Sequence, residues 1–355
     1  MSVKGYVIKT LNAGGLGIVI ALIPTSIIGT LLKPLAQDYP WIGTFVQFCT
    51  ATQFLASALV GFLVGLFLGQ NPIKNVSIAI VAFLSSGALA FTTYYTQDGN
   101  PVVVPTLKGL GDLVNAILMA GLAAFLFVKL GNVFRSLELI CLPIIGVFLG
   151  CIGQVFVLPG VSLITTSLAE LVEYLTTLNP VMMAVFIGAI FALIIVSPVS
   201  TVVVALAIQI NPVNSGVANL GITGTMISLL IGSLFVNKPG ISLTIGLGIV
   251  KMMVGNLFRY PILVLPLALT GAITGLSGYF LEIKGTSFSA GFGYSGLIGP
   301  IAAYDAFASA GQAGGAILRI ILAYVIIPIA SASLIHFIFV KVLRLYRLDI
   351  VRYEP

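Results

Sequence analysis

Residues 180–208 read PVMMAVFIGAIFALIIVSPVSTVVVALAI, and none of them is charged. The run is longer than the roughly 20 apolar residues that a helix needs to cross the hydrocarbon of a bilayer. Its apolar residues are continuous rather than alternating, which favours a helix over a barrel strand. The run therefore predicts a membrane-spanning helix. Pro198, which removes one helical hydrogen bond, predicts either a fixed kink or a hinge in it.

The rest of the chain has the same character. Only 7% of its 355 residues are charged, 59% are hydrophobic, and the mean hydropathy is +1.17. Soluble domains carry about 25% charged residues. We therefore expect an all-α integral membrane protein. The net charge of +6 comes mostly from residues at the ends of apolar runs, so we expect no direct contact with nucleic acid.

About ten transmembrane helices are expected. The apolar runs lie at about 13–36, 43–69, 76–95, 112–130, 139–158, 180–208, 216–236, 240–255, 261–281 and 315–341. With ten spans both termini share one side of the membrane, and most Lys and Arg residues then fall on that side. We therefore expect both termini in the cytoplasm.

The segments between these runs predict the organisation of the chain. The more polar run around Glu170 and Glu173 is expected to be interfacial or re-entrant. The expected divisions are a basic amphipathic lead-in (1–12), a first transmembrane half (13–158), an interfacial or re-entrant segment (159–179), a second transmembrane half (180–283), a Gly/Ser-rich re-entrant segment (284–312), a last transmembrane helix (313–343) and a basic cytoplasmic tail (344–355).

Two short motifs occur twice, in the same order. Asn71-Pro72 recurs as Asn211-Pro212, and the Gly-Asn pair at 131–132 recurs at 255–256, each time with a Leu-Pro pair downstream. This order predicts a parallel four-helix internal repeat. Transporters often arise from internal repeats and bind their solute where the repeats meet.

Residues 211–226, NPVNSGVANLGITGTM, are unusually polar for a membrane segment. Small and amide-bearing residues either allow close helix packing or line a cavity, and both interpretations stay open here. Neutral amides suit a solute rich in hydroxyl groups. The residues expected to contact such a solute are Asn211, Asn214, Ser215 and Asn219.

Residues 287–300, SFSAGFGYSGLIGP, combine four glycines with Ser and aromatic residues. The segment is either a connector outside the membrane or a re-entrant hairpin whose backbone N–H groups approach a ligand. On the second interpretation its solute contacts are Ser289, Gly291, Tyr294 and Ser295.

The remaining charged residues predict no catalytic centre. Asp305 and Arg319 are close enough in sequence to form an ion pair, and Asp305 is otherwise a candidate for ion or proton coupling. His336 is the only histidine, and no Ser-His-Asp set, metal cluster or pair of carboxylates can be assembled. We therefore expect a protein that is not an enzyme, with neither cofactor nor metal.

The two polar stretches and the Gly-rich apolar architecture resemble the membrane (IIC-like) component of bacterial phosphoenolpyruvate-dependent sugar phosphotransferase systems. More narrowly, they resemble the subgroup labelled toxin regulators or perfringolysin-regulator-like proteins. The resemblance implies a multi-pass permease of the bacterial inner membrane, usually a homodimer, that moves a sugar by displacing a transport domain. Phosphoryl transfer would need separate IIA and IIB proteins. The His and Glu of better-known IIC sugar sites match no position here.

Two functions are consistent with these features. The first is a transporter of a small polar solute, a sugar or sugar derivative. The alternative is a membrane sensor that signals indirectly through a cytoplasmic partner, docked on the basic tail from Lys341 to Arg352.

Overall fold

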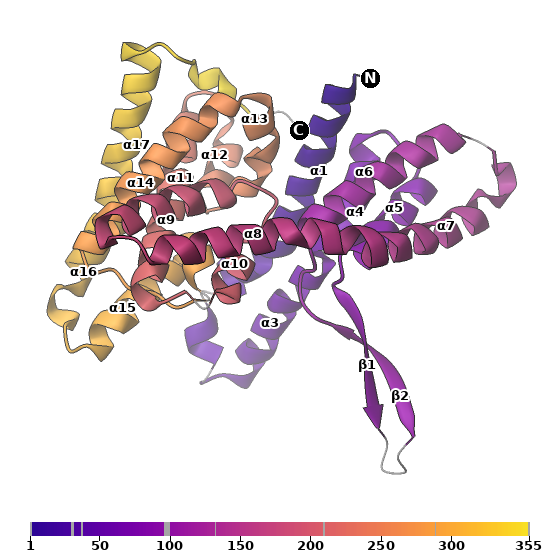
Figure 1. Cartoon of the computed structure of the whole chain (residues 1–355), viewed down its shortest axis with the longest axis horizontal. Coiled ribbons are helices and arrows are strands. Elements are labelled where there is room, and N and C mark those ends of the chain that lie inside the picture. Colours follow the sequence, from indigo (N-terminus) through magenta and orange to yellow (C-terminus); the bar gives the residue numbers. More distant parts are fainter. Residues whose placement is uncertain are drawn as a thin grey trace. The chain divides into compact units, whose positions relative to one another are not determined.

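The computed structural model describes residues 2–29, 32–36, 38–95, 100–131, 133–208, 210–287 and 289–353. The chain folds into two compact units (Figure 1). The first unit comprises Met1–Thr25 and Gly43–Ile164, and the second comprises Ser26–Ile42 and Thr165–Glu354. Within the described residues all regular structure is helical except for one two-stranded hairpin. The expectation of an all-α polytopic membrane protein is confirmed.

The first unit is a helical bundle with a hairpin attached. Its elements are α1 (Val3–Ile23), α4 (Ala56–Phe67), α5 (Pro72–Ser85), β1 (Leu89–Tyr95), β2 (Pro101–Leu107), α6 (Leu113–Leu130) and α7 (Glu138–Ile152), while α3 (Pro40–Ala51) and α8 (Leu158–Thr176) each run from one unit into the other. Helix α5 packs against α4, α6 and α7, and α1 packs against α4. A Cβ on Gly17 would lie 2.7 Å from the backbone nitrogen of Val60. Glycine therefore lets α1 and α4 approach closely.

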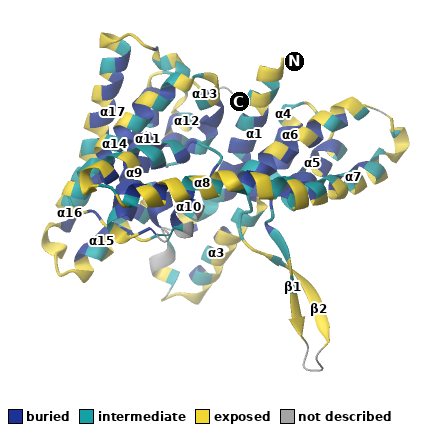
Figure 2. Ribbon diagram, viewed as in Figure 1, coloured by how far each residue is buried: buried dark blue, intermediate teal, exposed yellow. Residues whose placement is uncertain are grey.

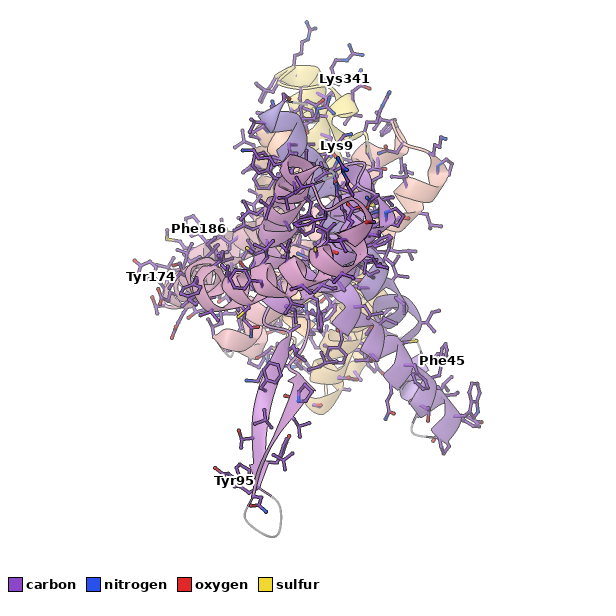
Figure 3. The ribbon with its side chains drawn as sticks, turned by 90° about the vertical axis from the view of Figure 1, so that its right-hand side faces the viewer. Lys9, Phe45, Tyr95, Tyr174, Phe186 and Lys341 are labelled. Carbon is purple, nitrogen blue, oxygen red and sulfur yellow. The ribbon has the colours of Figure 1, made fainter. Side chains whose placement is uncertain are left out.

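The hairpin was not predicted. Strands β1 and β2 pair antiparallel, with Leu89 opposite Leu107 and Tyr95 opposite Pro101. Figure 2 shows that most of the hairpin is exposed, and Figure 3 shows Tyr95 near its tip. Helix α5 ends at Ser85, and Gly87 then adopts a left-handed φ of +72°. The expected span at 76–95 is therefore wrong in its C-terminal part, because the chain turns into a strand there.

The second unit is built around α11. Its helices are α9 (Pro180–Ile194), α10 (Thr201–Ala207), α11 (Pro212–Leu234), α12 (Pro239–Gly246), α13 (Val254–Arg259), α14 (Val264–Phe280), α15 (Ile298–Ser309), α16 (Ala313–Ile321) and α17 (Ile327–Phe337). Every residue of α11 from Asn214 to Leu229 is buried, and α9, α12, α14 and α17 all pack against it (Figure 2).

Small residues bring α9, α11 and α14 together. A Cβ on Gly221 of α11 would collide with the carbonyl oxygen of Gly188 on α9, and a Cβ on Gly275 of α14 would lie 2.8 Å from the Cα of Gly188. Close packing between membrane helices depends on such residues. Part of the Gly-rich character of residues 211–226 therefore serves helix packing.

Seven helical stretches in the described residues are long and apolar enough to span a membrane, or up to eight if a bent pair counts as one span. The bent pair is Pro239–Gly246 with Val250–Arg259, at 119°. The expected spans at 76–95 and 180–208 correspond to α5 and α9, which are shorter than this criterion. Most of the segment at 159–179 is helical and continues the preceding helix, since Arg135–Thr176 is one helical stretch of 42 residues. Its interfacial or re-entrant placement stays a prediction.

The internal repeat has one local counterpart in the structure. Asn71 caps α5 by accepting a hydrogen bond from the backbone N–H of Lys74, and Asn211 caps α11 in the same way from Asn214, both at 2.9 Å. Asn179 also caps α9, so the motif is not restricted to the two positions. Gln209 and Asn132 lie outside the described residues. The repeat stays a prediction.

Candidate functional site

The first helix break in the second unit separates α9 from α10. Pro198 has no N–H to donate, and the chain leaves the helical path after Ile195. The Ser197 hydroxyl donates to the Ile194 carbonyl at 2.7 Å and accepts from the Val199 N–H at 3.1 Å. Ser197 thereby replaces hydrogen bonds that the break removes, which stabilises a non-helical segment between two apolar helices.

The second break lies between α12 and α13. Gly248 has a left-handed φ of +93°, and a Cβ there would lie 2.7 Å from the Cβ of Ser295. Both the backbone conformation and the close approach require glycine at this position. The helical path then resumes at Val250 in a new direction.

The third irregular segment connects α14 to α15. It contains two 3₁₀ turns, Ser289–Gly291 and Ser295–Leu297, with Gly293 at a φ of +61° between them. A Cβ on Gly291 would lie 2.6 Å from the backbone nitrogen of Val202. The glycines of this loop therefore allow tight turns and direct contact with the start of α10.

These three segments meet. The Thr201 hydroxyl donates to the Gly291 carbonyl at 2.8 Å, and the Ser295 hydroxyl donates to the Leu247 carbonyl at 3.2 Å. We call the group formed by Ser197–Thr201, Leu247–Lys251 and Ser289–Ser295 the three-break site. Irregular backbone at membrane depth is tolerated only where it is buried in protein or lines a cavity.

Lys251 joins two of the breaks. Its ammonium donates to the carbonyl oxygens of Ser197 and Val199 at 2.7 and 2.8 Å. These carbonyls follow the C-terminal end of α9, where a cation is favoured by the helix dipole. A partly buried cation held by backbone carbonyls inside an apolar region is a candidate functional residue.

Helix α11 holds the third segment. The Asn219 side chain, which is fully buried, accepts from the Gly293 N–H at 3.1 Å and donates to the Ser289 hydroxyl at 3.3 Å. The Ser215 hydroxyl donates to the Thr286 carbonyl at 2.5 Å. The two polar stretches singled out in the sequence are therefore in direct contact.

The chain matches the family model described as Phosphotransferase system, EIIC, over residues 8–352. The chain belongs to the EIIC family. EIIC proteins are the membrane permease components of sugar phosphotransferase systems, which work together with IIA and IIB proteins. The family model does not identify a subgroup, so membership of the regulator subgroup stays an expectation. No curated protein and no solved structure matches the chain.

In this EIIC protein, one group of predicted contact residues lies together. Asn219, Ser215, Ser289 and Gly291 lie at the contact between α11 and the loop, and the Asn219 amide and the two hydroxyls bond the protein itself. The Ser295 hydroxyl instead donates to the Leu247 carbonyl in the α12–α13 break. Their role in solute contact stays a prediction. In the structure, the hydrogen bonds of these residues hold the loop in its conformation.

The other three predicted contacts differ from this group. Asn211 is exposed and caps α11, whereas Asn214 is buried and makes its hydrogen bond to Asn211 through its backbone N–H. Within the described residues, the Tyr294 hydroxyl is buried without a hydrogen-bond partner, as is that of Tyr324 in the same apolar cluster. An unpaired buried hydroxyl costs about 1–3 kcal/mol, so it marks a position where a polar ligand or water would be stabilised.

The expected ion pair between Asp305 and Arg319 does not form. Arg319 instead pairs with Glu282 at 2.6 Å, and its guanidinium lies over the ring of Phe307. Glu282 has a left-handed φ of +57° directly after α14. This turn presents its carboxylate to α16, a placement that sequence separation alone does not reveal. A coupling role for Asp305, which is exposed, stays a prediction.

Lys251 was not predicted as a site residue, because most of the cations lie at the ends of apolar runs and this lysine was assigned to the same group. The available signal was its position, since Lys251 lies inside the apolar run from Ile241 to Phe258. An ionisable residue within such a run is by default a functional candidate.

Proposed function

We propose that this EIIC protein carries a small polar solute, a sugar or sugar derivative, across the bilayer, and that the three-break site binds it. Three helix interruptions that meet beside a buried helix carry this proposal. Transporters commonly bind substrate where discontinuous helices expose backbone groups near the middle of the membrane. The interruptions here likewise bring together non-helical backbone, hydroxyl groups and the Lys251 cation.

The chemistry of the site suits a neutral, hydroxylated solute. Tyr294 offers an unpaired hydroxyl, and the Asn219 amide orients the backbone of the loop. Each sugar hydroxyl can both donate and accept a hydrogen bond. We propose Asn211, Asn214, Ser215, Asn219, Ser289, Gly291, Tyr294 and Ser295 as the residues that contact or shape the solute site.

Movement of the solute would require the breaks to rearrange. Lys251 holds the α9–α10 break through two carbonyls, and Thr201 holds the loop to the start of α10. Release of these few hydrogen bonds would let short helical pieces move without unfolding the helices beside them. Helix termini and loop residues commonly absorb such changes.

The sensor alternative needs a basic tail that is free to dock a partner. Here Asn237 donates to the Val351 carbonyl at 2.9 Å, and Asn256 donates to the carbonyls of Ile350 and Arg352 at 2.9 and 2.7 Å. Val351 is fully buried. Because the tail packs as part of the second unit, these contacts favour the transporter over the sensor.

Uptake by reconstituted vesicles tests the proposal. Purified protein would be placed in vesicles and offered a panel of labelled sugars, with and without IIA and IIB proteins and phosphoenolpyruvate inside. We expect uptake of at least one sugar above protein-free vesicles, and phosphorylated product only when the soluble proteins are present. Absence of uptake for every sugar in both conditions would contradict it. Sedimentation of the same sample tests the expected homodimer.

A further inference from the structure

The chain after α17 folds back on the second unit in a fixed conformation. Arg344 adopts a left-handed φ of +51°, and the Leu345 N–H donates to the Phe339 carbonyl at 2.9 Å. Tyr346 is buried, and its hydroxyl lies 2.9 Å from Nδ1 of His336. The fold-back is therefore held by a helix cap and by a buried polar contact.

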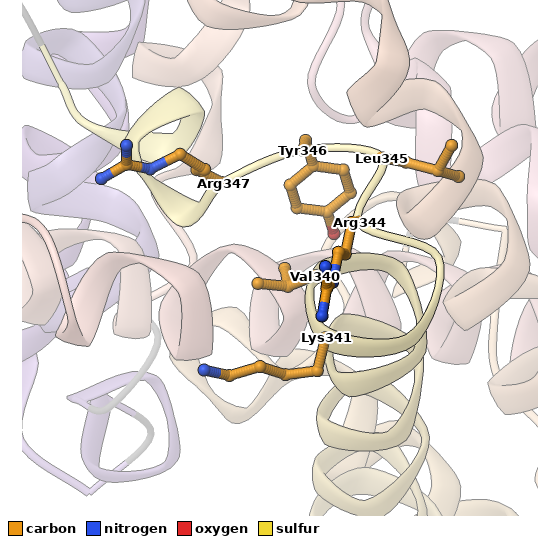
Figure 4. A pocket seen from close by; sticks show the side chains of 6 residues that line it. All are labelled: Val340, Lys341, Arg344, Leu345, Tyr346 and Arg347. Carbon is orange, nitrogen blue, oxygen red and sulfur yellow. The ribbon is translucent and has the colours of Figure 1, made fainter.

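This fold-back borders an open hollow of about 620 Å³. Its lining consists of Val340, Lys341, Arg344, Leu345, Tyr346 and Arg347 (Figure 4). In the view of Figure 4 the side chains of Lys341 and Arg347 extend toward the same side, whereas Leu345 extends to the opposite side. We call this feature the basic hollow.

The cations of the basic hollow are largely uncompensated. In the part of the chain that the structure describes, neither Lys341 nor Arg344 has an ion-pair partner. Arg347 lies 3.4 Å from Asp349, and both side chains are solvent-exposed. Exposed pairs of this kind contribute about 0–1 kcal/mol. The hollow therefore keeps a strong preference for an anion.

Helix capping does not account for these cations. The Leu343 N–H donates to the Ile338 carbonyl at 2.8 Å, and the Leu345 N–H donates to the Phe339 carbonyl. Backbone groups thus satisfy carbonyls at the helix end that a Lys or Arg side chain would otherwise cap. The two long cationic side chains are left available for another partner.

The position of the hollow indicates which partner that is. It lies where the candidate span Ala313–Val342 ends, and Figure 3 shows Lys341 at this end of the chain's last long helix. Val342 and Leu343, beside it, are 61% and 53% exposed. Apolar residues directly next to cations at the end of a span match the acyl chain and headgroup of a lipid.

We propose that the basic hollow binds the phosphate group of an anionic membrane lipid. The planar guanidinium of Arg344 suits a phosphate with two parallel hydrogen bonds, and Lys341 adds a second positive charge. The acyl chains then lie against Val342 and Leu343. This site is separate from the three-break site and does not depend on the proposed transport.

Native mass spectrometry of the full-length protein tests this proposal. Protein released from detergent would be titrated with phosphatidylglycerol, with phosphatidylcholine and with inorganic phosphate. The variants are Lys341→Gln with Arg344→Gln, and the matched control Lys108→Gln with Lys284→Gln, which removes two exposed cations that lie outside the candidate spans. Each cation near a lipid surface contributes about 1 kcal/mol, so we expect roughly 30-fold weaker phosphatidylglycerol binding in the first variant.

The control variant and the other two ligands decide the outcome. We expect the control to bind phosphatidylglycerol like wild type, and phosphatidylcholine and inorganic phosphate to bind at least about tenfold more weakly than phosphatidylglycerol. Equal loss in both variants would overturn the proposal, since it would reflect net charge alone. Binding of inorganic phosphate as tight as that of the lipid would overturn the lipid assignment, and unchanged binding in the first variant would overturn the site.

Discussion

The ammonium of Lys251 lies 2.7 Å from the carbonyl oxygen of Ser197, and this contact joins two interrupted helices of the second unit. The same ammonium bonds the Val199 carbonyl. One side chain thus satisfies two carbonyls that the Pro198 break leaves without helical partners. The geometry of this break therefore depends on Lys251 as well as on the Ser197 hydroxyl.

Replacing Lys251 by Met tests that dependence. Met keeps the length of the side chain but leaves two carbonyls without their donor, at a cost of about 1–3 kcal/mol for each buried group. We expect uptake to fall at least about tenfold, with Lys251→Arg retaining part of it because it keeps the donors. Lys238→Met is the control, since Lys238 is exposed before α12. Equal loss of uptake in the control would contradict a specific role.

Asn219→Leu tests whether the loop must be held by α11. Leu has a similar volume but cannot bond Gly293 or Ser289, so we expect a mobile loop and loss of sugar binding with little change in membrane insertion. Asn214→Leu separately tests direct solute contact, because within the described residues the bonds from α11 that hold the loop come from Ser215 and Asn219, whereas Asn214 bonds Asn211 through its backbone N–H. Binding by Asn219→Leu at wild-type affinity would show that the loop needs no such support.

Gly221→Ala tests the close packing of α9, α11 and α14. The new methyl would collide with the backbone of Gly188, which cannot rotate away, so we expect about 1–3 kcal/mol of destabilisation. Gly240→Ala is the matched control, because nothing lies within 4 Å of its Cβ position. Thermal unfolding in detergent should separate the two. Similar melting temperatures would argue against tight packing at Gly221.

The ionisation of Asp112 should make the stability of the folded protein depend on pH. It caps α6 by accepting from the Asn115 N–H at 2.9 Å, and burial raises the pKa of its carboxyl above the ordinary value despite hydrogen bonds from Asn115 and Val114 that lower it. Because the pKa of the folded state exceeds that of the unfolded state, the folded state binds more protons at pH values between these two pKa values. This group's contribution to stability is therefore lost as the pH rises through the folded pKa.

Asp112→Asn keeps an N-cap residue and removes the ionisation. We expect its melting temperature to exceed that of wild type more at neutral pH than at acidic pH. A difference between the two proteins that is the same at both pH values would refute the role of the Asp112 carboxyl.

Most helices could be predicted from the sequence, because a long apolar run indicates a segment that is buried in lipid. The hairpin was not predicted, because residues 89–95, which form its first strand, continue the apolar run that begins at about residue 76. Nor were the true lengths of α5 and α9 predicted. Their ends depend on Gly87 and on the Ser197-Pro198 turn, which are local backbone events within apolar sequence.

The candidate site was predictable only in part. The polarity of residues 211–226 and of residues 287–300 indicated a solute contact in each stretch, and the structure brings Asn219 and Ser289 of these stretches together. The Lys251 contacts and the Glu282–Arg319 pair could not be predicted, because each joins groups whose proximity is created by a break or a turn. Sequence separation carries no information about such a placement.

Sugar binding by Tyr294→Phe tests the central claim most directly. In the part of the chain that the structure describes, Tyr294 and Tyr353 both have a buried hydroxyl without a hydrogen-bond partner. Only Tyr294 lies in the three-break site, so Tyr353→Phe is a matched control. Calorimetry on purified protein with a sugar that it transports should show about five- to tenfold weaker binding for Tyr294→Phe, the loss of roughly one hydrogen bond, and no change for Tyr353→Phe. Unchanged affinity in Tyr294→Phe, or equal loss in both variants, would contradict the assignment of this site to the solute.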